Sequence, residues 1–194
     1  MKKLSTYLFL ILFSLSAPSF ADDVSDFQIE GMSIGDSLLD YFSEEEIKSW
    51  KKTFYPGSKK FYMAGDKKNF SSNIYDKLTF HLKSNDKKYT IYSLKGVKNF
   101  PNNLKACKKM KNEVNDEISS LLGNVKARNY ESKYKIDDGK TIAYVSEFEQ
   151  MGGEIRIWCV NVSKVSEKKR NWVDNLSVSV SSEEFAIWID EESR

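Results

Sequence analysis

Apolar residues recur along the chain with two different periods, and these periods restrict the folds that it can form. Between residues 102 and 122 they fall three or four positions apart, which is the spacing along one face of an α-helix. This apolar stripe consists of Leu104, Cys107, Met110, Val114, Ile118 and Leu121. Asn102 or Asn103 is the expected N-cap, and Gly123 is the expected stop. The chain therefore predicts one long helix with a single apolar face.

In several other segments apolar residues occupy every second position, as they do in half-buried β-strands. The expected strands are residues 60–63, 77–83, 88–94, 141–148, 154–161 and 176–180. Turns at residues 84–86 and 151–153 join four of them into two antiparallel hairpins. In the first hairpin Leu78, Phe80 and Leu82 are expected to face the core.

Short helices are expected at both ends of the chain. Residues 36–42 are expected to form the first, and Ser43 with Glu46 matches the capping box of a second. Ser181 or Ser182 would cap a final helix, whose apolar side consists of Phe185, Trp188 and Ile189. The predicted class is α+β: an antiparallel sheet built from two hairpins and further strands, one long helix packed across it, and short helices at both ends.

The N-terminus has the features of an export signal. Two lysines precede an uncharged and almost wholly apolar run at residues 4–15. This run is shorter than the roughly 20 residues that a membrane-spanning helix needs, but it has the length of a signal-peptide core. Ser19 and Ala21 are small enough for the subsites of a signal peptidase. We expect residues 1–21 to be a signal peptide cleaved after Ala21, leaving residues 22–194 as a single globular domain; an uncleaved membrane anchor is the alternative.

Export would place the mature chain in the periplasm or outside the cell. No second apolar run of spanning length follows the signal, so the mature protein is expected to be soluble. Both locations are oxidising, and Cys107 and Cys159 are the only two cysteines of the chain. Cys107 lies on the apolar stripe of the long helix, and Cys159 shares a strand face with Ile155 and Ile157. A disulfide between the two is therefore predicted, with two buried free thiols as the alternative.

The charge balance of the mature chain excludes one class of partner. The full chain has 30 basic and 28 acidic residues, and the predicted signal carries two lysines and no acid. The remaining chain is therefore neutral and is not expected to bind nucleic acid. His81 is the single histidine, expected on the solvent side of its strand, and with two distant cysteines it offers no metal-site spacing. No phosphate-loop or dinucleotide fingerprint is present, so no cofactor is expected.

Two short motifs near the mature N-terminus resemble hydrolase signatures. Residues 31–35 match the nucleophile-elbow pattern G-x-S-x-G, but they lack the preceding strands that an elbow requires. Residues 35–38 (Gly-Asp-Ser-Leu) resemble the motif of the GDSL hydrolases, which implies Ser37 as the nucleophile. The Asp-x-x-His that this family carries near its C-terminus is absent, and a serine without a base is a poor nucleophile. The alternative is that Ser37 caps a short helix.

Two further resemblances, both to exported proteins, imply no enzymatic activity. Residues 29–33 resemble the start of outer-membrane assembly lipoproteins of the SmpA/BamE type, whose lipidated cysteine this chain lacks. Most of the mature chain resembles uncharacterised secreted proteins of marine alphaproteobacteria. The shared features are the opening at residues 31–38, the cysteine-bearing helix and the Trp158-Cys159 strand.

Three functions are compatible with these observations. The first is an exported, non-enzymatic binding or interaction module; the alternatives are a GDSL-like hydrolase using Ser37 and an accessory protein of envelope assembly. Four aromatic residues could line a binding groove or could simply be packed in the core: Tyr55, Phe61, Tyr62 and Trp172.

Overall fold

The computed structural model describes residues 23–65 and 74–191. The predicted signal peptide and its cleavage site lie outside the described residues. Within the described ranges, no helix combines the length and the apolar character that crossing a membrane would require.

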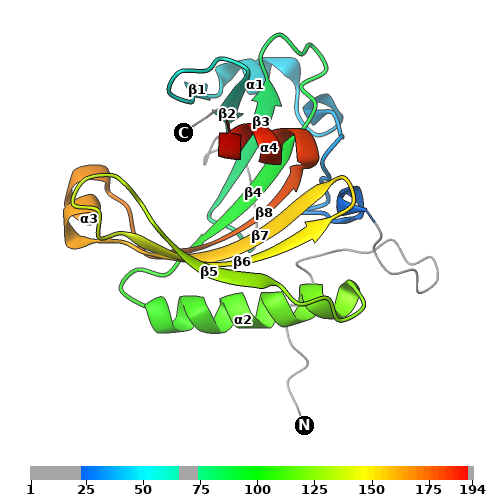
Figure 1. The fold of residues 1–194 in the computed structure, drawn as a ribbon. Helices are drawn as coiled ribbons and strands as arrows, with labels where there is room; N and C mark the ends of the chain where they lie inside the picture. The colour runs from blue at the N-terminus through cyan, green and yellow to red at the C-terminus, as the bar shows by residue number, and fades with distance from the viewer. Residues whose placement is uncertain (1–22, 66–73, 192–194) are drawn as a thin grey trace.

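One antiparallel sheet of eight strands organises the fold (Figure 1). The strands are β1 (Thr53–Phe54), β2 (Phe61–Ala64), β3 (Lys77–Lys83), β4 (Ser93–Asn99), β5 (Arg128–Lys133), β6 (Ile142–Gln150), β7 (Gly153–Asn161) and β8 (Asn175–Ser182). Their order in the sheet is β1-β2-β3-β4-β8-β7-β6-β5. Each half of the chain thus contributes four consecutive strands, and the pairing of β4 with β8 joins the two halves.

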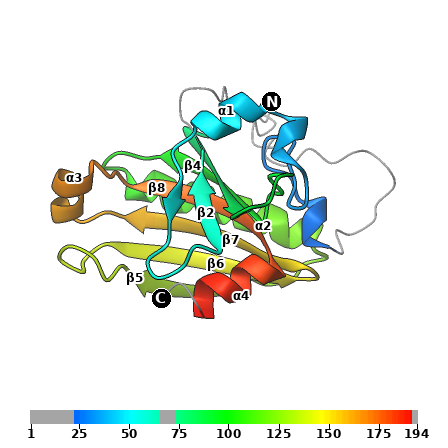
Figure 2. The ribbon, with the colours of Figure 1, turned by 90° about the horizontal axis from the view of Figure 1, so that it is seen from above.

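Helices cover both faces of this sheet. They are α1 (Glu44–Ser49), α2 (Leu104–Leu121), α3 (Lys164–Arg170) and α4 (Glu183–Glu191), and short 3₁₀ turns η1 (Val24–Asp26) and η2 (Leu38–Asp40) precede them. Figures 1 and 2 show α2 along one face and α4 on the opposite face, both against β7 and β8. This is the predicted α+β class, with the long helix packed across an antiparallel sheet.

The α2 face carries the main core. Leu78, Phe80 and Leu82 are buried there, as their alternation predicts, and Ile155 and Ile157 join them from β7. The stripe of α2 covers one half of this face. The N-terminal segment from residue 24 to residue 50 covers the other half, and the ring of its Trp50 stacks on Phe80 at 5.6 Å.

The α4 face carries a smaller apolar cluster. Phe185 and Trp188 of α4 pack on Phe61 of β2, with ring centroids 5.3 and 4.9 Å apart. Ser182 accepts a hydrogen bond from the backbone N–H of Phe185, so it caps α4 as predicted. The rest of this face is polar, because the residues between the apolar positions of β3, β4 and β8 are mostly Ser, Thr and Lys.

The first predicted hairpin is confirmed, but its second strand, β4, begins at Ser93, five residues after the start of the predicted strand at residues 88–94. The Asp86 carboxylate accepts hydrogen bonds from the backbone N–H groups of Lys88 and Thr90, which prolongs the turn. The backbone after this turn pairs with the N-terminal segment instead of β3, through Leu38 N to Tyr89 O (3.1 Å).

Other differences concern short or polar elements. The helix expected at residues 36–42 is only the 3₁₀ turn η2, whereas the capping box of Ser43 and Glu46 on α1 is confirmed. Asn103 is the cap of α2. β1, β5 and α3 were not predicted from the sequence, and β5 proves to be the strand that matters for the candidate site.

Candidate functional site

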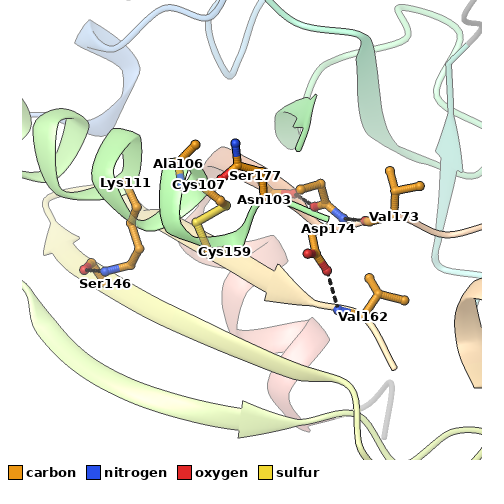
Figure 3. The surroundings of a disulfide bond; sticks show 11 residues. Asn103, Ala106, Cys107, Lys111, Ser146, Cys159, Val162, Val173, Asp174 and Ser177 are labelled. Carbon is orange, nitrogen blue, oxygen red and sulfur yellow. Dashed lines mark hydrogen bonds between the residues drawn. A yellow bond between two sulfur atoms is a disulfide. The ribbon is translucent and has the colours of Figure 1, made fainter. Parts of the chain in front are cut away.

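The two cysteines meet in the core, as predicted. Cys107 on α2 and Cys159 on β7 form a disulfide with their Cα atoms 5.9 Å apart, and both are fully buried (Figure 3). Close by, the Asp174 carboxylate accepts a hydrogen bond from the backbone N–H of Val162. The disulfide therefore fixes the long helix to the central part of the sheet, but it is shielded from any ligand.

The structure gives Ser37 a capping role. Its hydroxyl accepts a hydrogen bond from the backbone N–H of Leu39 (3.1 Å) and donates one to the carbonyl oxygen of Lys88 (2.6 Å). Leu38, which follows Ser37, is buried in the main core on the α2 face. The hydroxyl that the GDSL resemblance would make a nucleophile is thus committed to backbone groups.

His81 lies on the other face, and the expectation that it is solvated was wrong. Its ring is buried 4.5 Å from Phe185 of α4, and its Nε2 is hydrogen-bonded to the Tyr55 hydroxyl at 2.8 Å. Burial, followed by the positive charge of Lys95, lowers the pKa of His81 to about 3. The residue faces away from the α2 core as predicted, but α4 folds over that side. Ser37 and His81 are therefore not brought together.

The four aromatic residues considered for a groove are dispersed. Tyr55 and Phe61 pack on Trp188, with ring centroids 5.1 and 4.9 Å apart. Tyr62 is buried on the main-core side, and the exposed Trp172 has its ring centroid 6.2 Å from that of Tyr134. For all but Trp172, packing was the correct alternative.

A groove does exist on the α4 face of the sheet, over β5, β6 and β7. Its volume is about 380 Å³. It is lined by Arg128, Tyr130, Ser132, Tyr134, Ala143, Val145, Arg156, Trp158 and Asp190. The residues on β5 form its outer rim, and Asp190 closes it on the side of α4. Three of the lining side chains are aromatic, from β5, β7 and the segment that follows β5.

A buried carboxylate beneath the groove organises its charges. The side chain of Glu147 on β6 is only 2% exposed. It accepts hydrogen bonds from the Tyr130 hydroxyl and Arg156 Nε, both at 2.8 Å, and from Arg128. Burial alone would raise the pKa of Glu147, but these donors and the charge of Arg156 outweigh burial and lower it. Glu147 is thus a charged group held by three donors.

Arg156 extends this network to α4. Its guanidinium also binds Glu154 at 2.8 Å and Asp190 at 3.2 Å. Burial raises the pKa of Glu154 to about 7, and the negative charges of Glu147 and Asp190 act in the same direction against the attraction of Arg156. The network therefore holds α4 against β7 and contains one carboxyl group that titrates near neutral pH.

We expect Glu154→Gln to change the pH dependence of stability. The pKa of Glu154 is higher in the folded chain than its ordinary value, so its contribution to stability is complete below about pH 4.5 and is lost as pH rises through about 7. The variant should therefore match the wild type near pH 4 and exceed it by on the order of 2 kcal/mol near pH 8. His81, whose lowered pKa acts with the opposite sign, is present in both proteins and cancels. Urea unfolding at the two pH values measures this difference, and a difference that does not vary with pH would contradict it.

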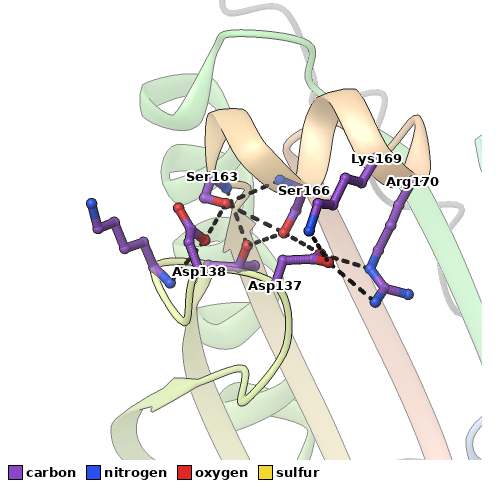
Figure 4. A network of polar contacts seen from close by, with 8 residues as sticks. Asp137, Asp138, Ser163, Ser166, Lys169 and Arg170 are labelled. Carbon is purple, nitrogen blue, oxygen red and sulfur yellow. Dashed lines mark hydrogen bonds and ion pairs between the residues drawn. The ribbon is translucent and has the colours of Figure 1, made fainter.

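The far end of the groove is fixed by a polar network (Figure 4). The loop between β5 and β6 carries Asp137, which accepts hydrogen bonds from Arg170 Nε (2.7 Å) and the Ser166 hydroxyl (2.9 Å). Asp138 of the same loop accepts a hydrogen bond from the Ser163 hydroxyl (2.7 Å). These contacts bind the loop to α3, so the rim that contains Tyr134 is held in place before any ligand arrives.

Comparisons with protein-family models, with curated proteins and with solved structures found no match. In the described part of the chain, no three His, Cys, Asp or Glu side chains are placed to hold a metal ion. The groove was not predicted from the sequence because β5, which forms its rim, was not predicted. Tyr130, the one aromatic residue in this polar stretch of β5, was the available signal.

Proposed function

We propose that the chain is an exported, non-enzymatic binding protein that holds a small molecule with a flat ring in the groove over β5, β6 and β7. The observation that carries this proposal is the combination of size and lining. A volume of about 380 Å³ falls in the range of small-molecule sites. Tyr130, Tyr134 and Trp158 offer faces on which a ring can stack.

The polar lining supports binding without reaction. The groove residues Arg128 and Arg156 are already paired with Glu147, and Asp190 is paired with Arg156. Because these side chains are already held in place, they offer hydrogen-bond donors and acceptors of fixed direction. A ligand that bound to them would cost little conformational entropy for ordering the side chains. Ser37 and His81, the residues of the hydrolase alternative, take no part in the groove. These features favour a binding protein over the hydrolase.

Export is part of the proposal and rests on the N-terminal sequence. The apolar run at residues 4–15 and the small residues at Ser19 and Ala21 support cleavage after Ala21. The disulfide of the structure suits the oxidising compartment that export would provide.

The groove can be filled without disturbing the core. Ser132 lines the groove and is exposed on the edge strand β5, so Ser132→Trp is expected to place an indole in it at a stability change within about 0.5 kcal/mol. Its matched control is Glu131→Trp, at the neighbouring exposed position, where the side chain points to the opposite face of the sheet.

The neutral ring compound naphthalene-2-carboxamide serves as the probe, with binding followed by saturation-transfer NMR. The wild type and Glu131→Trp are expected to bind it, and Ser132→Trp is expected to lose binding. Equal binding by all three proteins would show that the ring binds elsewhere, and an absence of binding to the wild type would contradict a ring-binding groove.

A further inference from the structure

We propose that the groove ends in an anion-binding site formed by Lys95 and Thr79, so that its ligand is a ring compound that carries a carboxylate. This inference rests on the proposed function and specifies the chemical class of the ligand. It concerns two residues of β3 and β4, which lie beyond β8 from the groove strands, toward the first half of the chain.

The strand register places the two residues on the same face of the sheet as the groove, with β8 between them and the groove strands. Thr79, Lys95, Ser179 and Arg156 are consecutive cross-strand partners on β3, β4, β8 and β7, so their side chains share one face of the sheet. Arg156 lines the groove itself. The ammonium of Lys95 lies 5.9 Å from the centroid of the Trp158 ring, which also lines the groove. A ligand stacked on Trp158 would therefore lie close to this ammonium.

Lys95 is a cation without a counterion among the described residues. Its side chain is half-buried, and two buried carboxylates on the same face of the sheet, Glu147 and Glu154, are held by Arg156. Its ammonium lies over the Trp158 ring, and no residue of the described ranges accepts a hydrogen bond from it. Burial, together with the charge of Lys77, lowers the pKa of Lys95 to about 8, which reflects how poorly the ammonium is compensated.

Thr79 supplies a second uncompensated group directly across from Lys95. The residue is 1% exposed, and its hydroxyl has no hydrogen-bond partner within the described residues. A buried polar group without a partner costs free energy, and such groups are rare in folded proteins. Ammonium and hydroxyl are both donors, and they stand at paired positions on neighbouring strands. An acceptor with negative charge satisfies both, and a carboxylate attached to a ring fits the adjoining groove.

The test compares naphthalene-2-carboxylate with the neutral naphthalene-2-carboxamide in mildly acidic buffer, by calorimetric titration. The wild type is expected to bind the carboxylate about tenfold more tightly, the size of effect that a hydrogen bond to a charged group produces. Lys95→Met keeps the length of the side chain and should abolish this preference, while its affinity for the carboxamide stays within about twofold of the wild type, which also shows that the variant is folded. Thr79→Val should weaken the preference by about threefold.

Lys77→Met is the matched control, because Lys77 lies on the same face of β3 but is exposed, and it should keep the full preference. A preference that persists in Lys95→Met overturns the anion site. Equal affinity of the wild type for both probes, lost in Ser132→Trp, also overturns it but leaves the proposed groove standing. Failure of both probes to bind the wild type overturns the anion site and the proposed function together.

Discussion

Replacing both Cys107 and Cys159 by alanine is expected to lower the free energy of unfolding by about 4 kcal/mol. The two residues are 52 positions apart in sequence, so their bond closes a long loop and lowers the conformational entropy of the unfolded chain. Both side chains are fully buried between α2 and β7, and the shorter alanines would also leave unfilled space there. Urea unfolding of the oxidised wild type and the double variant measures the difference.

Reduction of the wild type provides the control for the lost packing. Dithiothreitol breaks the bond but keeps both sulfur atoms in the core, so the reduced wild type should fall between the oxidised protein and the double variant. Equal stability of oxidised and reduced wild type would contradict a structural role for the bond.

The intact mass of exported protein reports the bond and the export signal together. We expect a chain that begins at Asp22 and is lighter by about two hydrogens than its reduced form. A chain that retains Met1 in the membrane fraction would contradict cleavage. Two thiols that react with an alkylating reagent in unreduced, denatured protein would contradict the disulfide.

Glu147→Ala has the second largest expected effect, a loss of about 3 kcal/mol of stability. The carboxylate is buried and is held by Arg128, Tyr130 and Arg156, so its removal leaves donors without their acceptor beneath the groove. In the variant, Arg156 keeps its ion pairs with Asp190 of α4 and Glu154 of its own strand. The expected loss of stability is therefore at the lower end of the range for a broken buried ion pair.

Glu149→Ala is the matched control for this substitution. Glu149 lies on the same strand and the same face as Glu147, two positions later, but it is exposed. Its removal should change stability by no more than about 0.5 kcal/mol. Thermal and urea unfolding of the two variants compare them directly. Similar losses from both would show that the network beneath the groove does not stabilise the fold.

The main core could be predicted from sequence because its signals are local. The helical stripe of α2 and the alternation of β3 and β7 each fix which side chains face inward. Cys107 and Cys159 occupy such inward positions, so their meeting followed once the helix was placed on the sheet. The spacing of apolar residues in each segment depends only on the geometry of the helix or strand that it forms. Tertiary packing did not override that spacing.

The candidate site could not be predicted in the same way. β5 is an edge strand exposed along most of its length, so no apolar alternation distinguishes it from a polar loop. Thr79 and His81 have polar side chains at the outward positions of β3, and nothing within β3 indicates that α4 packs against that face. The groove and the row that contains Lys95 therefore depend on contacts between distant segments, which a single sequence does not display.

The most direct test of the binding proposal is the indole N–H signal of Trp158 in a two-dimensional ¹H–¹⁵N NMR spectrum during titration with naphthalene-2-carboxylate. Trp158 lines the groove, whereas Trp50 lies in the main core and Trp188 of α4 lies in the smaller apolar cluster with Phe61. We predict that the Trp158 signal shifts in a saturable manner, that the signals of Trp50 and Trp188 stay in place, and that Ser132→Trp abolishes the shift. A Trp158 signal that does not move at saturating probe, or that moves equally in Ser132→Trp, would contradict a ligand in this groove.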